Sequence, residues 1–136
     1  MSQENVEIAR RAHAAASRRP KPDFATVNAL FHPDHELVSL VRFRQSGLRG
    51  ASGFRDWLTD IEEAYGPSWE MRLDEARAVG EGRVLLAVVI GLQGRQSGVP
   101  VEQRMGIVMT LRDGKVIRTE TYPSVEDALK AVGLEE

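Results

Sequence analysis

The chain has 136 residues and a formal net charge of −2, with 42% hydrophobic and 28% charged residues. Its length suits one domain around one core, and its composition excludes a disordered chain. A charge this close to zero provides no general attraction to nucleic acid or to an anionic membrane. We therefore expect a single domain over residues 1–136 that binds neither.

Cysteine is absent, which removes disulfides, thiolate metal ligands and a cysteine nucleophile. The N-terminal segment 1–16 is amphipathic and lacks the apolar centre of a signal peptide. The longest apolar run, Val84 to Ile90, is too short to span a bilayer. These features predict a cytoplasmic location.

Two helices are predicted in the N-terminal third. The first covers residues 2–17, and small or apolar residues recur along it at helical spacing. They are Val6, Ala9, His13 and Ala16. Asp23 can cap a short second helix, which Pro33 is expected to end.

An extended segment is predicted from His35 to Phe43, followed by a third helix that Ser52 opens and Gly66-Pro67 stops. This third helix has a single apolar stripe. The stripe consists of Phe54, Trp57, Leu58, Ile61 and Tyr65.

The remainder is predicted to be mainly strand, over 69–79, 83–93, 101–111 and 115–122. Asp113-Gly114 indicates a tight hairpin, because both residues tolerate positive φ. Ser124 can cap a short C-terminal helix that ends at Gly133.

The segment Val101 to Leu111 alternates with a period of two. One face is mostly apolar and consists of Val101, Gln103, Met105, Ile107, Met109 and Leu111. Such a strand belongs to a sheet buried on one side only. Helices followed by an antiparallel meander indicate an α+β fold, in which a curved, mostly antiparallel sheet packs against the N-terminal and central helices. This arrangement leaves a conical cavity that can hold a small ligand.

Five motifs occur in order along the chain: "SQENVEIARRAHAA", "LFHPDHEL", "GLRGASGFRDWL", "TLRDGKVIRTETY" and "SVEDALKAVGL". Together they resemble the actinobacterial SnoaL-like (polyketide-cyclase-like) branch of the nuclear-transport-factor-2-like superfamily. The resemblance implies a cone-shaped α+β barrel, a pocket between the sheet and the helices, and a homodimer. It does not imply one reaction, because this fold serves many functions.

The resemblance also locates the functional positions of ketosteroid isomerases. Their carboxylate base falls on Ser39, their tyrosine at about Ala12, next to His13, and their second acid on Ile107. Serine is not a base near neutral pH, and isoleucine cannot donate a hydrogen bond to an oxyanion. We therefore predict that the chain does not catalyse ketosteroid isomerisation.

The predicted pocket is mostly apolar and contains a few polar groups. Its residues are His13, Ser39, Trp57, Gln103, Met105 and Ile107. His13 is an acid/base, a group that orients a ligand's oxygen, or a partly buried histidine bonded to a backbone carbonyl or to water. Gln103 is expected to be a buried amide, which either bonds a neighbour or contacts a ligand. The spacing of His32 and His35 around Pro33 does not suit a metal site, and no cofactor is expected.

Glu102, Arg104 and Glu120 are expected to form a charged cluster on the outer sheet face. That face also carries Val108 and Thr110, and we expect it to pair two copies into a homodimer. Three functions stay open. They are binding of a small hydrophobic molecule, isomerase, cyclase or hydratase chemistry on a small carbonyl compound with His13 as acid/base, and non-catalytic dimeric association.

Overall fold

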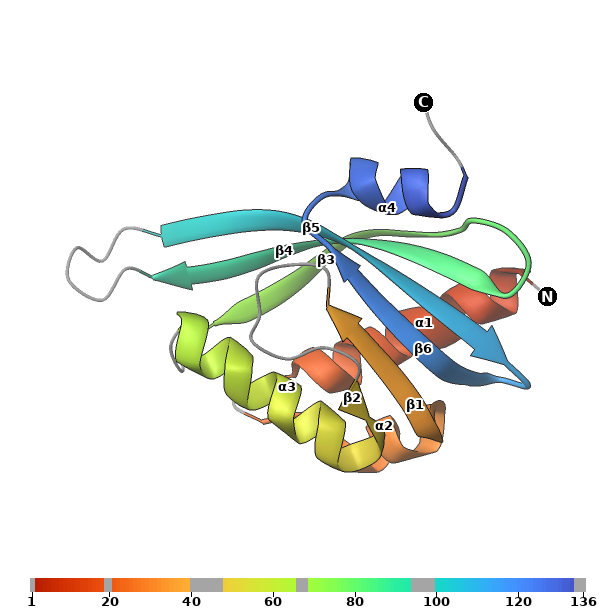
Figure 1. Cartoon of the computed structure of the whole chain (residues 1–136), viewed down its shortest axis with the longest axis horizontal. Coiled ribbons are helices and arrows are strands. Elements are labelled where there is room, and N and C mark those ends of the chain that lie inside the picture. The colour runs from red at the N-terminus through yellow and green to blue at the C-terminus, as the bar shows by residue number, and fades with distance from the viewer. Residues whose placement is uncertain (1, 19–20, 40–47, 66–68, 94–99, 134–136) are drawn as a thin grey trace.

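The computed structural model describes residues 2–18, 21–39, 48–65, 69–93 and 100–133 (Figure 1). The helices are α1 (Ser2–Ser17), α2 (Phe24–Leu30), α3 (Gly50–Tyr65) and α4 (Val125–Ala131). The strands are β1 (Phe31–Ser39), β2 (Leu48–Arg49), β3 (Glu70–Ala78), β4 (Arg83–Gln93), β5 (Pro100–Arg112) and β6 (Lys115–Tyr122).

The described strands form one sheet in the order β2-β1-β6-β5-β4-β3. The β1–β6 pair is parallel and the other neighbours are antiparallel. The last strand of the chain therefore lies inside the sheet, between the first strand and β5. Register shifts interrupt the β1–β6, β3–β4 and β5–β6 pairs, and such irregularities bend and twist a sheet.

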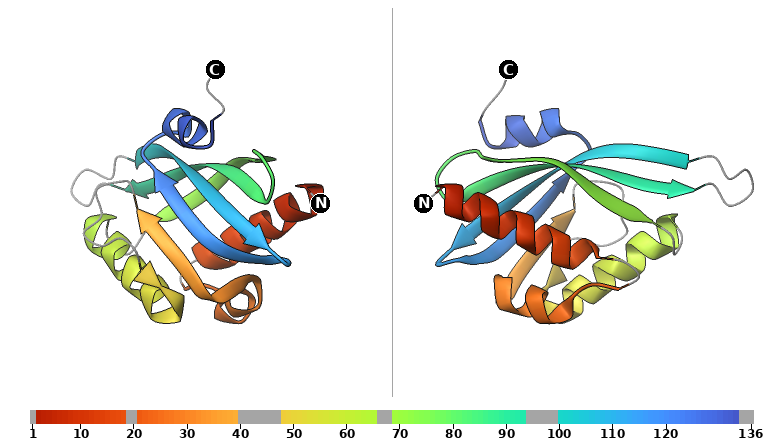
Figure 2. Two further views of the ribbon diagram at one scale, coloured as in Figure 1. Left: turned by 45° about the vertical axis from the view of Figure 1, so that its right-hand side comes forward. Right: turned by 180° about the vertical axis from the view of Figure 1, so that it is seen from behind.

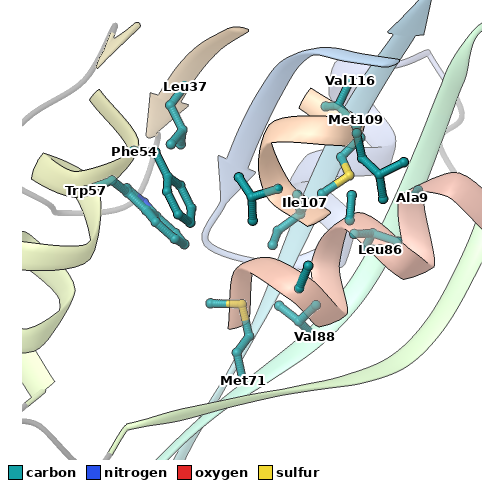
Figure 3. Close-up of a cluster of buried hydrophobic side chains, with 14 of the residues drawn as sticks. Ala9, Leu37, Phe54, Trp57, Met71, Leu86, Val88, Ile107, Met109 and Val116 are labelled. Atoms are coloured by element: carbon teal, nitrogen blue, oxygen red, sulfur yellow. The ribbon is translucent and has the colours of Figure 1, made fainter. Parts of the chain in front are cut away.

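Helices α1, α2 and α3 cover one face of the sheet, and α4 lies on the other (Figures 1 and 2). The main core fills the space between the sheet and the first three helices, and Figure 3 shows part of it. A smaller core beneath α4 includes Leu85 and Val108. The structure thus confirms the predicted α+β fold, a cone-shaped, curved, mostly antiparallel sheet packed against the N-terminal and central helices.

Local chemistry explains several element boundaries. Asp113 and Gly114 have φ values of 53° and 78°, as the predicted tight hairpin requires. Ser124 Oγ accepts a 3.0 Å hydrogen bond from the backbone N–H of Asp127 and so caps α4. The carboxylate of Asp23 accepts hydrogen bonds from the N–H of Thr26 at 3.3 Å and from its hydroxyl at 2.7 Å, which caps α2.

The start of β1 differs from the prediction. The strand begins at Phe31 rather than His35, and α2 ends at Leu30, so Pro33 lies within a strand. The β1–β6 register is irregular between Phe31 and Glu36, and an interrupted ladder needs no N–H from proline. The predicted end of this segment, Phe43, lies outside the described residues.

The charged cluster expected on the outer face is divided between two groups. Arg118 bonds Glu36 at 2.8 Å and approaches Glu120 at 3.6 Å, whereas Glu102 pairs with Arg72 at 3.6 Å. The prediction was wrong because the strand register places Glu120 opposite Val108, four positions along β5 from Arg104, and places Arg118 opposite Glu36 on β1. Helix α4 also buries Val108 completely, so part of the expected dimer surface is covered.

Candidate functional site

Two neighbouring cavities lie on the helix-covered side of the sheet. The outer cleft has a volume of about 370 Å³ and the inner chamber about 30 Å³. Both are lined by Phe31 and His35 of β1 and by Phe54 of α3, so these side chains separate them. The rest of the outer cleft is lined by Phe24, Val27, Asn28, His32, Pro33, Gly50 and Arg55.

The inner chamber lies at the centre of the cone. Besides the shared residues, it is lined by His13, Ala16, Ser17, Leu37, Trp57, Met71, Ile107, Met109, Thr119 and Thr121. Figure 3 shows Phe54 and Trp57 of α3 on one side of this region, and Met71 and Ile107 on the other. A volume of about 30 Å³ exceeds the roughly 10–15 Å³ that a cavity needs to hold one water molecule, so the chamber admits one small group.

Two buried nitrogen atoms in the chamber wall lack a hydrogen-bond partner among the described residues. They are Nε2 of His13 and Nε1 of Trp57, whose residues are 6% and 7% exposed. More than nine in ten buried polar groups in native proteins are hydrogen-bonded. Neither atom is accessible to a water-sized molecule, and the accessible wall of the chamber is apolar, so the chamber as it stands suits a small apolar group.

His35 is the site residue that the sequence interpretation missed. It is 4% exposed, and its Nε2 lies 2.7 Å from Thr119 Oγ1 on the neighbouring strand β6. The ring of Phe31 stands edge-on to the imidazole, with ring centroids 4.8 Å apart. His35 is thus held by one hydrogen bond and one aromatic contact at the boundary between the two cavities.

Both chamber histidines are neutral at physiological pH. Burial lowers the pKa of His13 and of His35 to about 4, because removal from water disfavours the charged imidazolium. Among the described residues that line the two cavities there is no aspartate or glutamate. The inner chamber is accordingly an uncharged space, and its accessible wall is apolar.

The outer cleft is aromatic. The rings of Phe24 and Phe31 each lie 6.4 Å from the ring of Phe54, between centroids, the first pair edge-on and the second tilted. Arg55, one position after Phe54 on α3, adds a positive charge to the wall. These contacts suit the flat apolar body of a small molecule.

The structure brings three of the predicted pocket residues together and leaves two, Met105 and Gln103, outside both cavities. His13, Trp57 and Ile107 line the inner chamber. Met105 is fully buried but lines neither cavity, and the side chain of Ser39 lies outside the described residues.

Gln103 differs from the expected buried amide, because it is exposed. It pairs with Ile90, which belongs to the main core, so the predicted strand face is correct. It lies near the start of β5, beyond the end of β6, which last pairs with β5 at Gly106.

No group of three or more histidine or acidic residues in the described part of the chain could hold a metal ion. His32 Nδ1 instead accepts a 2.9 Å hydrogen bond from the backbone N–H of Asp34. None of the described helices is long and apolar enough to cross a membrane.

No family model and no curated protein sequence matches the chain. Solved structures do match. TerC co-crystallised with polyporic acid has a TM-score of 0.72 and 20% identity, covering 95% of this chain and 98% of that protein. A SnoaL-like polyketide cyclase candidate from Jannaschia sp. CCS1 has a TM-score of 0.70 and 13% identity. The match covers 99% of this chain and 95% of that protein.

An NTF2-like protein from Burkholderia xenovorans LB400 has a TM-score of 0.67 and 21% identity, and 98% of each chain is covered. Identities at this level establish a shared fold and leave the reaction and the ligand open. The chain therefore has the NTF2-like fold that SnoaL-like and ketosteroid-isomerase-like proteins share.

Proposed function

We propose that the protein binds a small, mostly apolar molecule in the outer cleft, with one end of that molecule directed toward the inner chamber. The observation that carries this proposal is the aromatic wall of the outer cleft, formed by Phe24, Phe31 and Phe54, next to a small chamber with an apolar accessible wall. Aromatic side chains of this kind provide a large apolar contact area for a flat ligand.

The dimensions of the two cavities support this division of roles. Typical ligand sites measure roughly 300 to 1,000 Å³, so the outer cleft can hold the body of a ligand and the chamber only its tip. Burial of apolar surface, at roughly 25 cal/mol per Å², supplies the affinity, and the different sizes of the two cavities set the orientation. The solved relative TerC was crystallised with polyporic acid, which is consistent with a ligand of this general kind.

Acid–base catalysis on a small carbonyl compound, by an isomerase, cyclase or hydratase reaction, is the second candidate. It is favoured by the two imidazoles of His13 and His35 in the wall of one chamber. However, a group with a pKa of about 4 is protonated in roughly one molecule in a thousand at neutral pH. His13 would be a poor general acid and a weak base, so binding is the better-supported function.

The binding proposal is tested by filling the cleft from its exposed rim. Asn28 is exposed on α2 and lines the outer cleft, whereas its neighbour Ala29 is exposed and does not. Titration calorimetry with 2-acetylnaphthalene, a flat apolar ketone, should show binding to the wild type and to Ala29→Trp, and none to Asn28→Trp. Equal affinity for all three proteins would place the binding site elsewhere.

We further propose that two copies associate through the part of the outer sheet face that α4 leaves uncovered. Glu102 and Arg104 are exposed there, and their opposite charges can pair about a two-fold axis. Sedimentation equilibrium at tens of micromolar should give the dimer mass, and Arg104→Glu should shift the equilibrium toward monomer. A monomer mass for the wild type would contradict this association.

A further inference from the structure

The distribution of charge in the outer cleft indicates which class of ligand the proposed site would bind. Arg55 is the only lysine or arginine among the described residues that line the two cavities, and no carboxylate lines either. The chain as a whole has a net charge of −2, so this positive character is local to the cleft. A local positive group at an aromatic cleft suits an anion rather than a cation or a neutral molecule.

Arg55 is available to a ligand. It is exposed, and its guanidinium makes no ion pair or hydrogen bond with another described residue. Its neighbour Asp56 projects from a different side of α3, because consecutive helical residues do not face each other. An unpaired guanidinium offers five N–H donors in a planar fork that matches a carboxylate.

The other wall residues define the rest of the ligand. Phe24, Phe31 and Phe54 surround the cleft with aromatic rings. Gly50, the first residue of α3, lines the same cleft, and the first turn of that helix contains no acidic residue. The partial positive charge at this helix end therefore adds to that of Arg55.

We propose that the ligand is an aromatic carboxylic acid, bound as its anion. This inference rests on the proposed function and deepens it. The carboxylate pairs with Arg55 at the rim, the ring system lies among the three phenylalanines, and the opposite end of the molecule faces His35 and the inner chamber. Neutral aromatic molecules of the same shape then bind in the same place but more weakly.

The test compares 2-naphthoate with 2-naphthamide, which has the same shape and no charge, by titration calorimetry at neutral pH. Wild-type protein should bind the acid about tenfold more tightly, the usual effect of one charge-assisted hydrogen bond at a partly exposed site. Arg55→Gln should weaken binding of the acid far more than binding of the amide and so abolish this preference. Added sodium chloride should weaken binding of the acid only.

The matched control is Arg112→Gln, because Arg112 is exposed at the β5–β6 hairpin and lines neither cavity. It should keep the full preference for the acid. Equal affinities of the wild type for acid and amide, or a preference that survives Arg55→Gln, would overturn the inference and leave the binding proposal intact. Failure of the wild type to bind either compound or 2-acetylnaphthalene would contradict both.

Discussion

His35 Nε2 and Thr119 Oγ1 lie 2.7 Å apart across the parallel pair of β1 and β6, although the residues are 84 positions apart in the chain. The bond occupies Nε2 of His35 and fixes the ring that separates the outer cleft from the inner chamber. His13, by contrast, keeps its Nε2 unpartnered. The two histidines therefore differ: His35 is held in place by a side-chain hydrogen bond, whereas Nε2 of His13 is buried without a partner among the described residues.

Replacement of Thr119 by valine should lower the free energy of unfolding by about 1–3 kcal/mol. The hydroxyl is lost while the shape is kept, so Nε2 of His35 stays buried without a partner. Thr119→Ser keeps the hydroxyl and should cost about 1 kcal/mol or less, from the lost methyl group. Urea denaturation of the two variants measures the difference, and equal costs would show that the bond contributes little.

Stability should fall as the pH is lowered from about 6.5 to about 4. The pKa values of His13 and His35 are depressed from 6.5 to about 4 in the folded protein, so in this window the unfolded chain binds more protons. Each histidine should contribute up to about 1.4 kcal/mol per pH unit. The urea midpoint should be measured across this pH range, and it should depend less steeply on pH for His13→Leu than for the wild type. An unchanged slope would mean that His13 is accessible to protons in the folded state.

Gly106→Ala should destabilise the protein far more than Gly91→Ala. A Cβ atom at Gly106 would lie 2.8 Å from Cβ of Ala128 and 2.9 Å from the carbonyl oxygen of Ser124, so α4 would have to move. At Gly91 nothing lies within 4 Å of the added atom. Overpacking of this kind costs typically about 1–3 kcal/mol. Thermal melts of the two variants test this, and similar melting temperatures would show that α4 adjusts freely.

A ligand that reaches the inner chamber should perturb Trp57 and leave Trp69 unchanged. Trp57 lines the chamber, whereas Trp69 is buried in the core and lines neither cavity. With both tryptophans replaced by 5-fluorotryptophan, added 2-acetylnaphthalene should shift only one fluorine resonance. The Trp57→Phe variant should lack that resonance, which assigns it. A shift confined to Trp69 would place the ligand outside the proposed site.

Helices and strands could be predicted from the sequence where a repeating pattern of apolar residues shows which face is buried. The alternation of Met105, Ile107 and Met109 correctly identified the core-facing side of β5. The same alternation could not show that Gln103 is exposed, because exposure depends on what covers a face. Pro33 was interpreted as the end of a helix, whereas an interrupted strand pair accommodates it equally well.

The site was less predictable than the fold. His13 was found because it interrupts a helical apolar face, which is a local signal. His35 was not, because its partner Thr119 is distant in sequence and only the β1–β6 pairing brings them together. Arg55 was missed for a similar reason, since an exposed helical arginine has no unusual feature until the phenylalanines beside it are seen to form a cleft.

The position of β6 between β1 and β5 has a consequence for synthesis on the ribosome. A nascent chain that ends before Lys115 contains β1 but lacks the strand that joins it to β5. Its β1 edge toward β6 is then open to solvent or to other chains. Because Phe31 and His35 of that strand form part of the cleft wall, a ligand-competent pocket is expected only after the last strand has emerged.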